Sequence, residues 1–226
     1  GLHGGDEVTL AAAASVAGIP TTRARRLLSE LAETHLLTER FPGRYGFHDL
    51  LHAYAAEQTL TGDSESDRRA ATRRLLDHHL HSAYAADRLV YPHRDPIALA
   101  PAAAGVTVRE FAGHTEALDW FTAERAALLS AVEQAARTGF DAHACHLAWA
   151  LSDFLNLRGH RHDQAVVQRT ALEAAARLQN VSAKIPDHPG AQHYKIHAFD
   201  FPLLADRAIE VCDTYSSIAP DVPHAL

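Results

Sequence analysis

The residues with the clearest chemical potential lie where a predicted β-hairpin passes directly into a helix. In the stretch 44–57, His48 and Asp49 stand at this joint. The N–H groups of a helix's first turn have no carbonyl partner inside the helix, and an imidazole beside them can meet a phosphate. In the structural alternative, Asp49 caps the helix, which stabilises it by about 1 kcal/mol, and His48 packs against the hairpin. The pair therefore predicts either phosphate sensing or a helix start.

A second group with chemical potential is a set of arginines in the same region. Arg23, Arg25 and Arg26 lie on a predicted helix, where a DNA-reading winged helix places its recognition residues, and Arg44 flanks the predicted hairpin turn. These side chains could contact DNA, dock on a partner domain or form an ordinary solvated face. Nearby glutamates dilute the positive charge, and the net charge of the chain is −7. This balance argues against a chain whose whole surface binds nucleic acid.

The chain contains 17 histidines, which raises the question of a metal site. Zinc sites need three or four converging ligands, and neither HExxH nor paired CxxC spacing occurs. The best further cluster is His193 and His197, four residues apart on a predicted helix, with Asp200 near the same face. Packing within a repeat is the better explanation of these residues. We therefore predict no metal site, and a His-rich metallohydrolase is the weakest of the functional alternatives.

Hydrophobic periodicity and breaker residues predict a mainly α chain. The predicted helices are 6–17, 22–35, 49–59, 66–89, 114–137, 140–157, 160–178, 191–199 and 203–216, and the predicted hairpin strands are 36–41 and 44–47. Residues 107–111 could form a short strand or an extended segment. The order helix, helix, hairpin, helix is that of a winged helix. The later antiparallel helix pairs, with glycine-marked turns, favour an α-solenoid of the tetratricopeptide type.

The same pattern predicts four parts. These are a winged-helix domain at 1–62, a helical arm and linker at 63–105, a tetratricopeptide-like region at 106–179 and a further helix pair at 180–226. A change in basic residues marks the last boundary, because 18 of the 19 arginines precede it and both lysines, Lys184 and Lys195, follow it. The last part could therefore be of separate origin.

Composition favours a helical chain with a sizeable core, since 47% of the residues are hydrophobic. We expect no membrane partner and no secretion, because no apolar run approaches the roughly 18 residues of a span and no signal-peptide pattern occurs. Two distant cysteines, Cys145 and Cys212, fit a reducing compartment, so the expected location is cytoplasmic. The absence of methionine and the opening Gly-Leu-His-Gly-Gly lead us to expect an internal fragment.

Several motifs in the first 178 residues occur together in one known family. They are Thr34-His-Leu-Leu-Thr38, Gly43-Arg-Tyr-Gly-Phe-His-Asp-Leu-Leu-His52, Ala85-Ala-Asp-Arg-Leu-Val-Tyr-Pro-His93, Ala117-Leu-Asp-Trp-Phe-Thr-Ala-Glu-Arg125, Leu147-Ala-Trp-Ala-Leu151 and Leu157-Arg-Gly-His160. With them, residues 1–178 resemble the region that follows the nucleotide-binding domain in actinobacterial SARP-type transcriptional activators, which are STAND-class regulators of the NB-ARC type. Residues 184–226 resemble a different bacterial tetratricopeptide family.

The resemblance implies a winged helix, a helical arm and a tetratricopeptide sensor that binds a protein partner or an inducer. In such switches a Met-His-Asp-like triplet senses the nucleotide, and Phe47-His48-Asp49 occupies that place. His48 would donate to the β-phosphate of ADP, and exchange for ATP would release the winged helix. The nucleotide-binding domain is expected upstream, since no Gly-x-x-x-x-Gly-Lys-Ser/Thr motif occurs here. We therefore expect ADP or ATP in the full-length protein, and neither a cofactor nor catalysis in this fragment.

These observations predict a non-catalytic regulatory fragment of a STAND-type transcriptional activator. It would couple the nucleotide state of an NB-ARC domain to a protein-binding helical sensor. The main alternative is a DNA-binding winged helix fused to a tetratricopeptide sensor or dimerisation module. The arginines on the helix 22–35 distinguish the two, because they would bind either a separate nucleotide-binding domain or duplex DNA.

Overall fold

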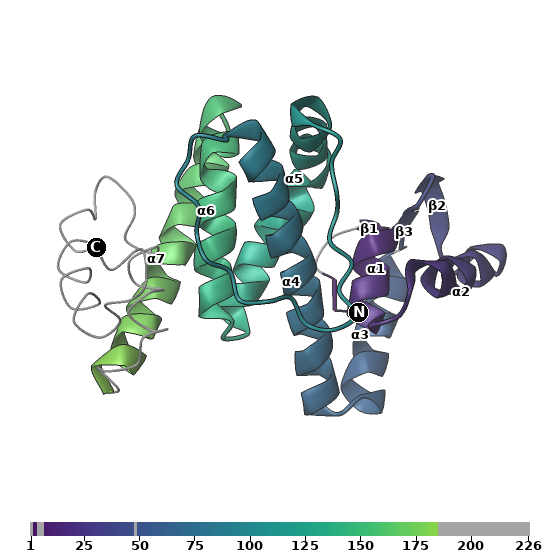
Figure 1. Cartoon of the computed structure of the whole chain (residues 1–226). Coiled ribbons are helices and arrows are strands. Elements are labelled where there is room, and N and C mark those ends of the chain that lie inside the picture. Colours follow the sequence, from purple (N-terminus) through teal and green to yellow (C-terminus); the bar gives the residue numbers. More distant parts are fainter. Residues whose placement is uncertain (1, 4–6, 48, 185–226) are drawn as a thin grey trace. The chain divides into compact units, whose positions relative to one another are not determined.

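The structure is a computed structural model that describes residues 2–3, 7–47 and 49–184, without the side chains of residues 49, 179 and 181–184. Its elements are β1 (Glu7–Thr9), α1 (Leu10–Ala17), α2 (Thr21–Glu33), β2 (Thr38–Phe41), β3 (Arg44–Gly46), α3 (Asp49–Gly62), α4 (Glu65–Val90), α5 (His114–Arg137), α6 (Asp141–Leu157) and α7 (Arg161–Lys184) (Figure 1). The predicted fold class is confirmed: the chain is mainly α, with a small N-terminal hairpin followed by helix pairs. The predicted helices 191–199 and 203–216 lie outside the described residues. The described residues form two compact units, one from the residues up to 94 with 98–131, and one from residues 95–97 with 132–184.

The N-terminal sheet contains one strand that the sequence analysis missed. The strand order is β1-β3-β2, both pairs are antiparallel, and Val8 lies opposite Tyr45. The prediction of a helix over 6–17 is therefore wrong at its start, where residues 7–9 form a strand. Thr9 is the physical reason, because its extended backbone ends the strand and its hydroxyl accepts a hydrogen bond from the Ala12 N–H at 3.2 Å. It caps the helix that starts at Leu10.

α1 and α2 form a helix-turn-helix around a small core. The turn begins at Gly18, whose positive φ of 64° lets its N–H reach the carbonyls of Ala14 and Ser15 at the end of α1. The core cluster consists of Val8, Ala12, Leu28, Leu37, Tyr45 and Leu75.

The apolar side of α2 is only partly buried. Leu28 is buried, but Leu27, Leu31 and Leu36 are 39%, 39% and 44% exposed. His35 has a φ of 58° and turns the chain out of the helix, so that Leu37 enters the core in place of Leu36. A left-handed backbone conformation is hard to predict from sequence at a residue other than glycine.

Residues 98–113, which we call the return segment, contain no strand, so the strand alternative for 107–111 is not realised. Polar side chains of α4 hold the segment by its backbone N–H groups. Ala103 N–H donates to Asp77 Oδ2 at 2.9 Å, and Arg109 N–H donates to the hydroxyl of Ser82 at 3.0 Å. Asp77 and Ser82 are both buried, so these bonds satisfy groups that would otherwise be costly to remove from water.

The return segment also contacts α1. Thr107 N–H donates to the buried hydroxyl of Ser15 at 2.9 Å. Gly105 has a φ of 83°, and a Cβ built at this position would lie 3.0 Å from the Cα of Gly18. The backbones of the two glycines therefore meet at a distance that only glycine permits.

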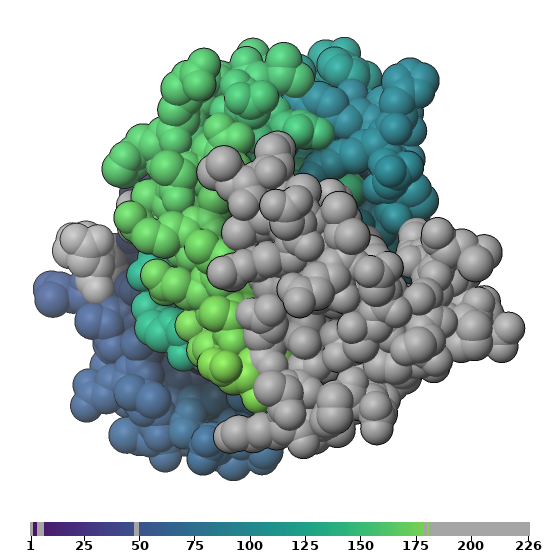
Figure 2. All heavy atoms as spheres, turned by 90° about the vertical axis from the view of Figure 1, so that its left-hand side faces the viewer, coloured from purple at the N-terminus to yellow at the C-terminus, as the bar shows by residue number. Residues whose placement is uncertain are grey.

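The second unit contains the pair α6 and α7, which pack against each other (Figure 1). Arg177 of α7 donates to Asp141 Oδ1 at 2.7 Å and to the carbonyl of Ala136 at 3.2 Å. Buried apolar residues of both helices fill the space between them, including Leu151 and Ala174. On the opposite side, exposed side chains of α7 form part of the face that Figure 2 shows in light green.

Candidate functional site

His48 and Asp49 belong to the strongest motif, but the structure does not describe their side chains. His48 lies outside the described residues, and so does the side chain of Asp49, although the backbone of α3 begins at that residue. The phosphate-sensing hypothesis for this pair therefore stays a prediction.

The four candidate arginines do not form one surface. Arg25 and Arg44 line the same cavity in the first unit, whereas Arg23 and Arg26 line a separate hollow with Thr22. Arg26 is exposed and pairs with Glu30 one helical turn away at 3.3 Å. Arg23 and Arg26 therefore face solvent along α2, while Arg25 and Arg44 belong to a built site.

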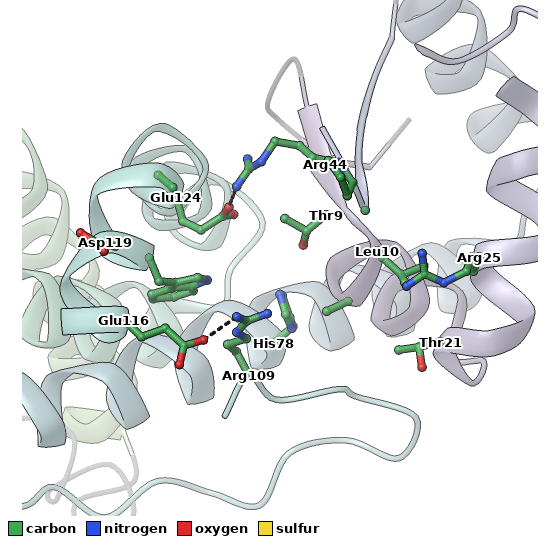
Figure 3. Close-up of a pocket in the computed structure, with 15 residues that line it drawn as sticks. Thr9, Leu10, Thr21, Arg25, Arg44, His78, Arg109, Glu116, Asp119 and Glu124 are labelled. Carbon is green, nitrogen blue, oxygen red and sulfur yellow. Dashed lines mark hydrogen bonds and ion pairs between the residues drawn. The ribbon is translucent and has the colours of Figure 1, made fainter. Parts of the chain in front are cut away.

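This arginine-lined cavity has a volume of about 590 Å³, and six parts of the first unit contribute to it. The contributors are the starts of α1 and α2, the hairpin turn between β2 and β3, α4, the return segment and the first half of α5. Its lining residues are Thr9, Leu10, Ala11, Thr21, Arg25, Pro42, Gly43, Arg44, His78, Arg109, Glu116, Asp119, Trp120, Ala123 and Glu124. Figure 3 shows Arg44 reaching from the hairpin toward Glu124, and Arg109 pointing toward Glu116.

Most of the charge in the cavity is paired. Arg44 donates to Glu124, whose side chain is only 4% exposed, and a second carboxylate, Glu7 Oε2, lies 3.7 Å from Arg44 Nη1. Arg109 donates to Glu116 at 2.7 Å. The N–H of Ala112 and this guanidinium both lower the pKa of Glu116 from its ordinary value.

His78 belongs to the cavity wall and to a buried histidine cluster. Its Nδ1 donates to the carbonyl of Thr107 at 2.5 Å, since a carbonyl can only accept, and this bond fixes the tautomer. The ring centroids of His78 and His79 are 5.2 Å apart, and His3 stacks on His79 at 6.2 Å. Burial lowers the pKa of all three, that of His79 furthest because its ring is the most completely buried, and the other two rings lower it further.

This cluster predicts a loss of stability in mild acid. The three rings are neutral in the folded protein, while the unfolded chain takes up protons below about pH 6.5. Stability is therefore fully present above that pH and falls as the pH drops, by up to about 1.4 kcal/mol per pH unit for each ring. Urea unfolding between about pH 7.5 and pH 5.5 measures the slope.

The control for this experiment is an exposed histidine. His35→Gln should keep the full slope, whereas His79→Gln should reduce it even if the variant is less stable overall. A free energy of unfolding that stays constant over this pH range would contradict the prediction.

The sequence analysis did not single out Arg109, Glu124 or Trp120 as site residues. One signal for Glu124 was present. It occupies the same row of α5 as the buried Ala117, Phe121 and Leu128. A carboxylate on a buried row requires a cation, so the pattern demands a partner without saying which of the 19 arginines it is.

The described cysteine has a packing role. Burial raises the pKa of the Cys145 thiol to about 12, and its Sγ lies 3.6 Å from the carbonyl of Ala171 on α7. A thiol that stays protonated at neutral pH is a poor nucleophile and metal ligand. Cys212 lies outside the described residues.

Over residues 2–3, 7–47 and 49–184, no three histidine, cysteine or carboxylate side chains are grouped so that they could hold a metal. His193, His197 and Asp200 lie beyond this part. Among the described helices, none combines the length and hydrophobicity of a membrane span.

Comparison with known proteins relates the chain to bacterial regulatory proteins. It is 36% identical over 200 residues to the regulatory protein AfsR of Streptomyces coelicolor, an alignment that covers 81% of this chain and 19% of AfsR. It is 33% identical over 182 residues to AfsR of Streptomyces griseus, covering 77% of this chain and 18% of that protein. The chain thus spans about a fifth of the length of these relatives. No protein-family model and no solved structure matches it.

Proposed function

We propose that this chain is a non-catalytic regulatory segment of a STAND-type transcriptional regulator. In this proposal its N-terminal helices and hairpin form a winged helix that senses the nucleotide on an NB-ARC domain. The helical part that follows binds a protein partner or an inducer. The relation to AfsR supports a regulatory role, and the strand order β1-β3-β2 beside a helix-turn-helix supports a winged helix.

One observation carries the proposal: charged contacts fasten the N-terminal part to the helices that follow. Arg74 of α4 donates to the carbonyls of Ser15 and Val16 at the end of α1, at 3.0 and 2.6 Å. Arg44 beside the hairpin turn donates to Glu124 of α5. Both contacts cross between elements far apart in sequence, so a displacement of the hairpin is transmitted directly to α5, and a displacement of α1 is transmitted to α4.

The nucleotide-sensing step is assigned to His48. In the ADP state its imidazole would donate to the β-phosphate and hold the winged helix against the nucleotide-binding domain. Exchange for ATP would remove that contact and shift the population toward a second packing. The arginines of α2 (Arg23, Arg25 and Arg26) and Arg44 beside the hairpin turn would lie near the docked domain.

The test uses the full-length protein that contains this segment. His48→Ala should release bound ADP during purification and raise basal transcription from a reporter, because the ADP state loses a contact that the ATP state does not make. His93→Ala, an exposed histidine in the loop after α4, is the matched control and should retain ADP. Wild-type ADP retention and wild-type basal activity in His48→Ala would refute the sensing role.

DNA binding is the second candidate, and the exposure of Arg23 and Arg26 on α2 favours it. The second helix of a helix-turn-helix enters the major groove with such side chains. In a mobility-shift assay, Arg23→Gln should weaken binding to all duplexes alike and reduce its salt dependence. Binding that is absent at low salt would leave docking as the role of this surface.

A further inference from the structure

We propose that the arginine-lined cavity binds a small organic anion that carries a flat ring. The volume of about 590 Å³ lies within the range of about 300–1,000 Å³ that is usual for ligand pockets. The lining also has the usual character of such pockets, because apolar groups (Leu10, Pro42, Ala123 and Trp120) alternate with a few charged ones.

The charges that remain after pairing lie on opposite sides of the cavity, Arg25 on α2 and Asp119 on α5, so an anion is expected at the Arg25 side. Arg44 and Arg109 are neutralised by Glu124 and Glu116. Among the described residues, no ion pair involves Arg25. Figure 3 shows its side chain extending from α2 toward Leu10 at the start of α1. A guanidinium at this point can give two parallel hydrogen bonds to a phosphate or carboxylate.

Two helix starts reinforce this preference for an anion. Leu10 and Ala11, in the first turn of α1, and Thr21, at the first position of α2, all line the cavity. The N–H of Ala11 has no carbonyl partner within its helix, and the N-cap of α2, Pro20, supplies no side-chain cap. Both helix dipoles therefore present their positive ends to the space that Arg25 reaches.

Trp120 is the reason for proposing that the ligand carries a flat ring. It is half-buried on the α5 side of the cavity, and Phe111 holds its indole edge-on at a centroid distance of 5.3 Å. An indole fixed in this way offers a rigid surface for a flat ring, with little side-chain entropy left to lose. A ligand between Arg25 and Trp120 would also lie beside the ion pair of Arg44 and Glu124.

Titration of the 226-residue chain with phenyl phosphate and with benzoate tests the proposal. The two probes share an aromatic anion and distinguish a phosphate ligand from a carboxylate ligand. Calorimetry should give one saturable site for at least one of them. Inorganic phosphate, which lacks the ring, and benzyl alcohol, which lacks the charge, should bind more weakly. The ligand should also change the tryptophan fluorescence, and Trp120→Phe should abolish that change although Trp149 remains.

Arg25→Gln should weaken binding of the aromatic anion at least about tenfold, because a charge-assisted hydrogen bond is lost. Arg23→Gln, on the same helix but outside the cavity, should leave it unchanged. Both side chains are exposed, so both variants should fold. The proposal is overturned if neither aromatic anion binds saturably, if the two variants lose affinity equally, or if inorganic phosphate binds as tightly as phenyl phosphate. The experiment is independent of the nucleotide relay, because it requires only this chain.

Discussion

Replacing Arg44 with methionine is expected to lower the free energy of unfolding of the first unit by about 3 kcal/mol. The side chain of Glu124 is 4% exposed, and Arg44 is the cation bonded to it. Removing one partner of a buried ion pair leaves the other charge away from water without compensation. This penalty is larger than the net contribution of the intact pair, since forming the pair also required removing both charges from water.

A double-mutant cycle separates the net contribution of the ion pair from the penalty for leaving one of its charges unpaired. Glu124→Met alone should cost less than Arg44→Met, because Arg44 is 23% exposed and retains Glu7 nearby. The double variant should recover most of the stability, since two apolar side chains can fill the space of the pair. Trp120 fluorescence in a Trp149→Phe background reports the first unit during urea unfolding.

The exposed pair of Arg26 and Glu30 is the matched control. Arg26→Met removes a salt bridge of the same residue types whose side chains are 76% and 57% exposed, and it should change stability by less than about 0.5 kcal/mol. Equal effects of the two arginine substitutions would mean that burial of Glu124 is not what makes Arg44 important.

Gly105→Ala is expected to destabilise the first unit by about 2–4 kcal/mol. Two effects combine at this position. The φ of 83° strains any L side chain, and the new Cβ would lie 3.0–3.1 Å from the Cα, carbonyl carbon and oxygen of Gly18. These are backbone atoms, so they cannot move aside as a flexible side chain would. The midpoint of urea unfolding, read from Trp120, measures the loss.

Two other glycines isolate the contributions. Gly139 has a φ of 75° but no neighbour within 4 Å of a built Cβ, so Gly139→Ala should show only the backbone strain, about 1 kcal/mol, read from Trp149 because both lie in the second unit. Gly62 has neither feature, and Gly62→Ala should be neutral or slightly stabilising. If Gly105→Ala costs no more than Gly139→Ala, the close approach to Gly18 does not constrain the fold.

The helices could be predicted from sequence where their periodicity was long and their ends were marked. The predicted 114–137 agrees with α5, and 66–89 differs from α4 by one residue at each end. β1 was missed because three residues give too short a pattern to separate from the alanine-rich helix that follows. The contacts of the return segment could not be predicted from the local sequence either. Its prolines and alanines indicate a linker, whereas its backbone N–H groups bond to side chains of α4.

The candidate site could be predicted only in part, for a related reason. Arg25 and Arg44 were selected by type and position, and the structure places both at one cavity. Glu124, the partner of Arg44, lies 80 residues away, on a helix whose pairing no local pattern specifies. Local rules identify the residue that needs a partner, and only the tertiary fold supplies the partner.

The hydrogen bonds from α4 to the return segment limit how this region can change in length. Asp77 and Ser82 are five positions apart on a helix, and they receive the N–H groups of residues 103 and 109. One residue inserted or deleted between 103 and 109 would misalign these bonds and move glycine away from position 105. The stretch from 91 to 97 is fixed to α4 as well, because Arg94 pairs with the buried Asp87 at 3.1 Å and Arg88 donates to the carbonyl of Pro92 at 3.0 Å. Insertions and deletions should therefore destabilise the chain in both stretches, although both have the sequence of ordinary loops.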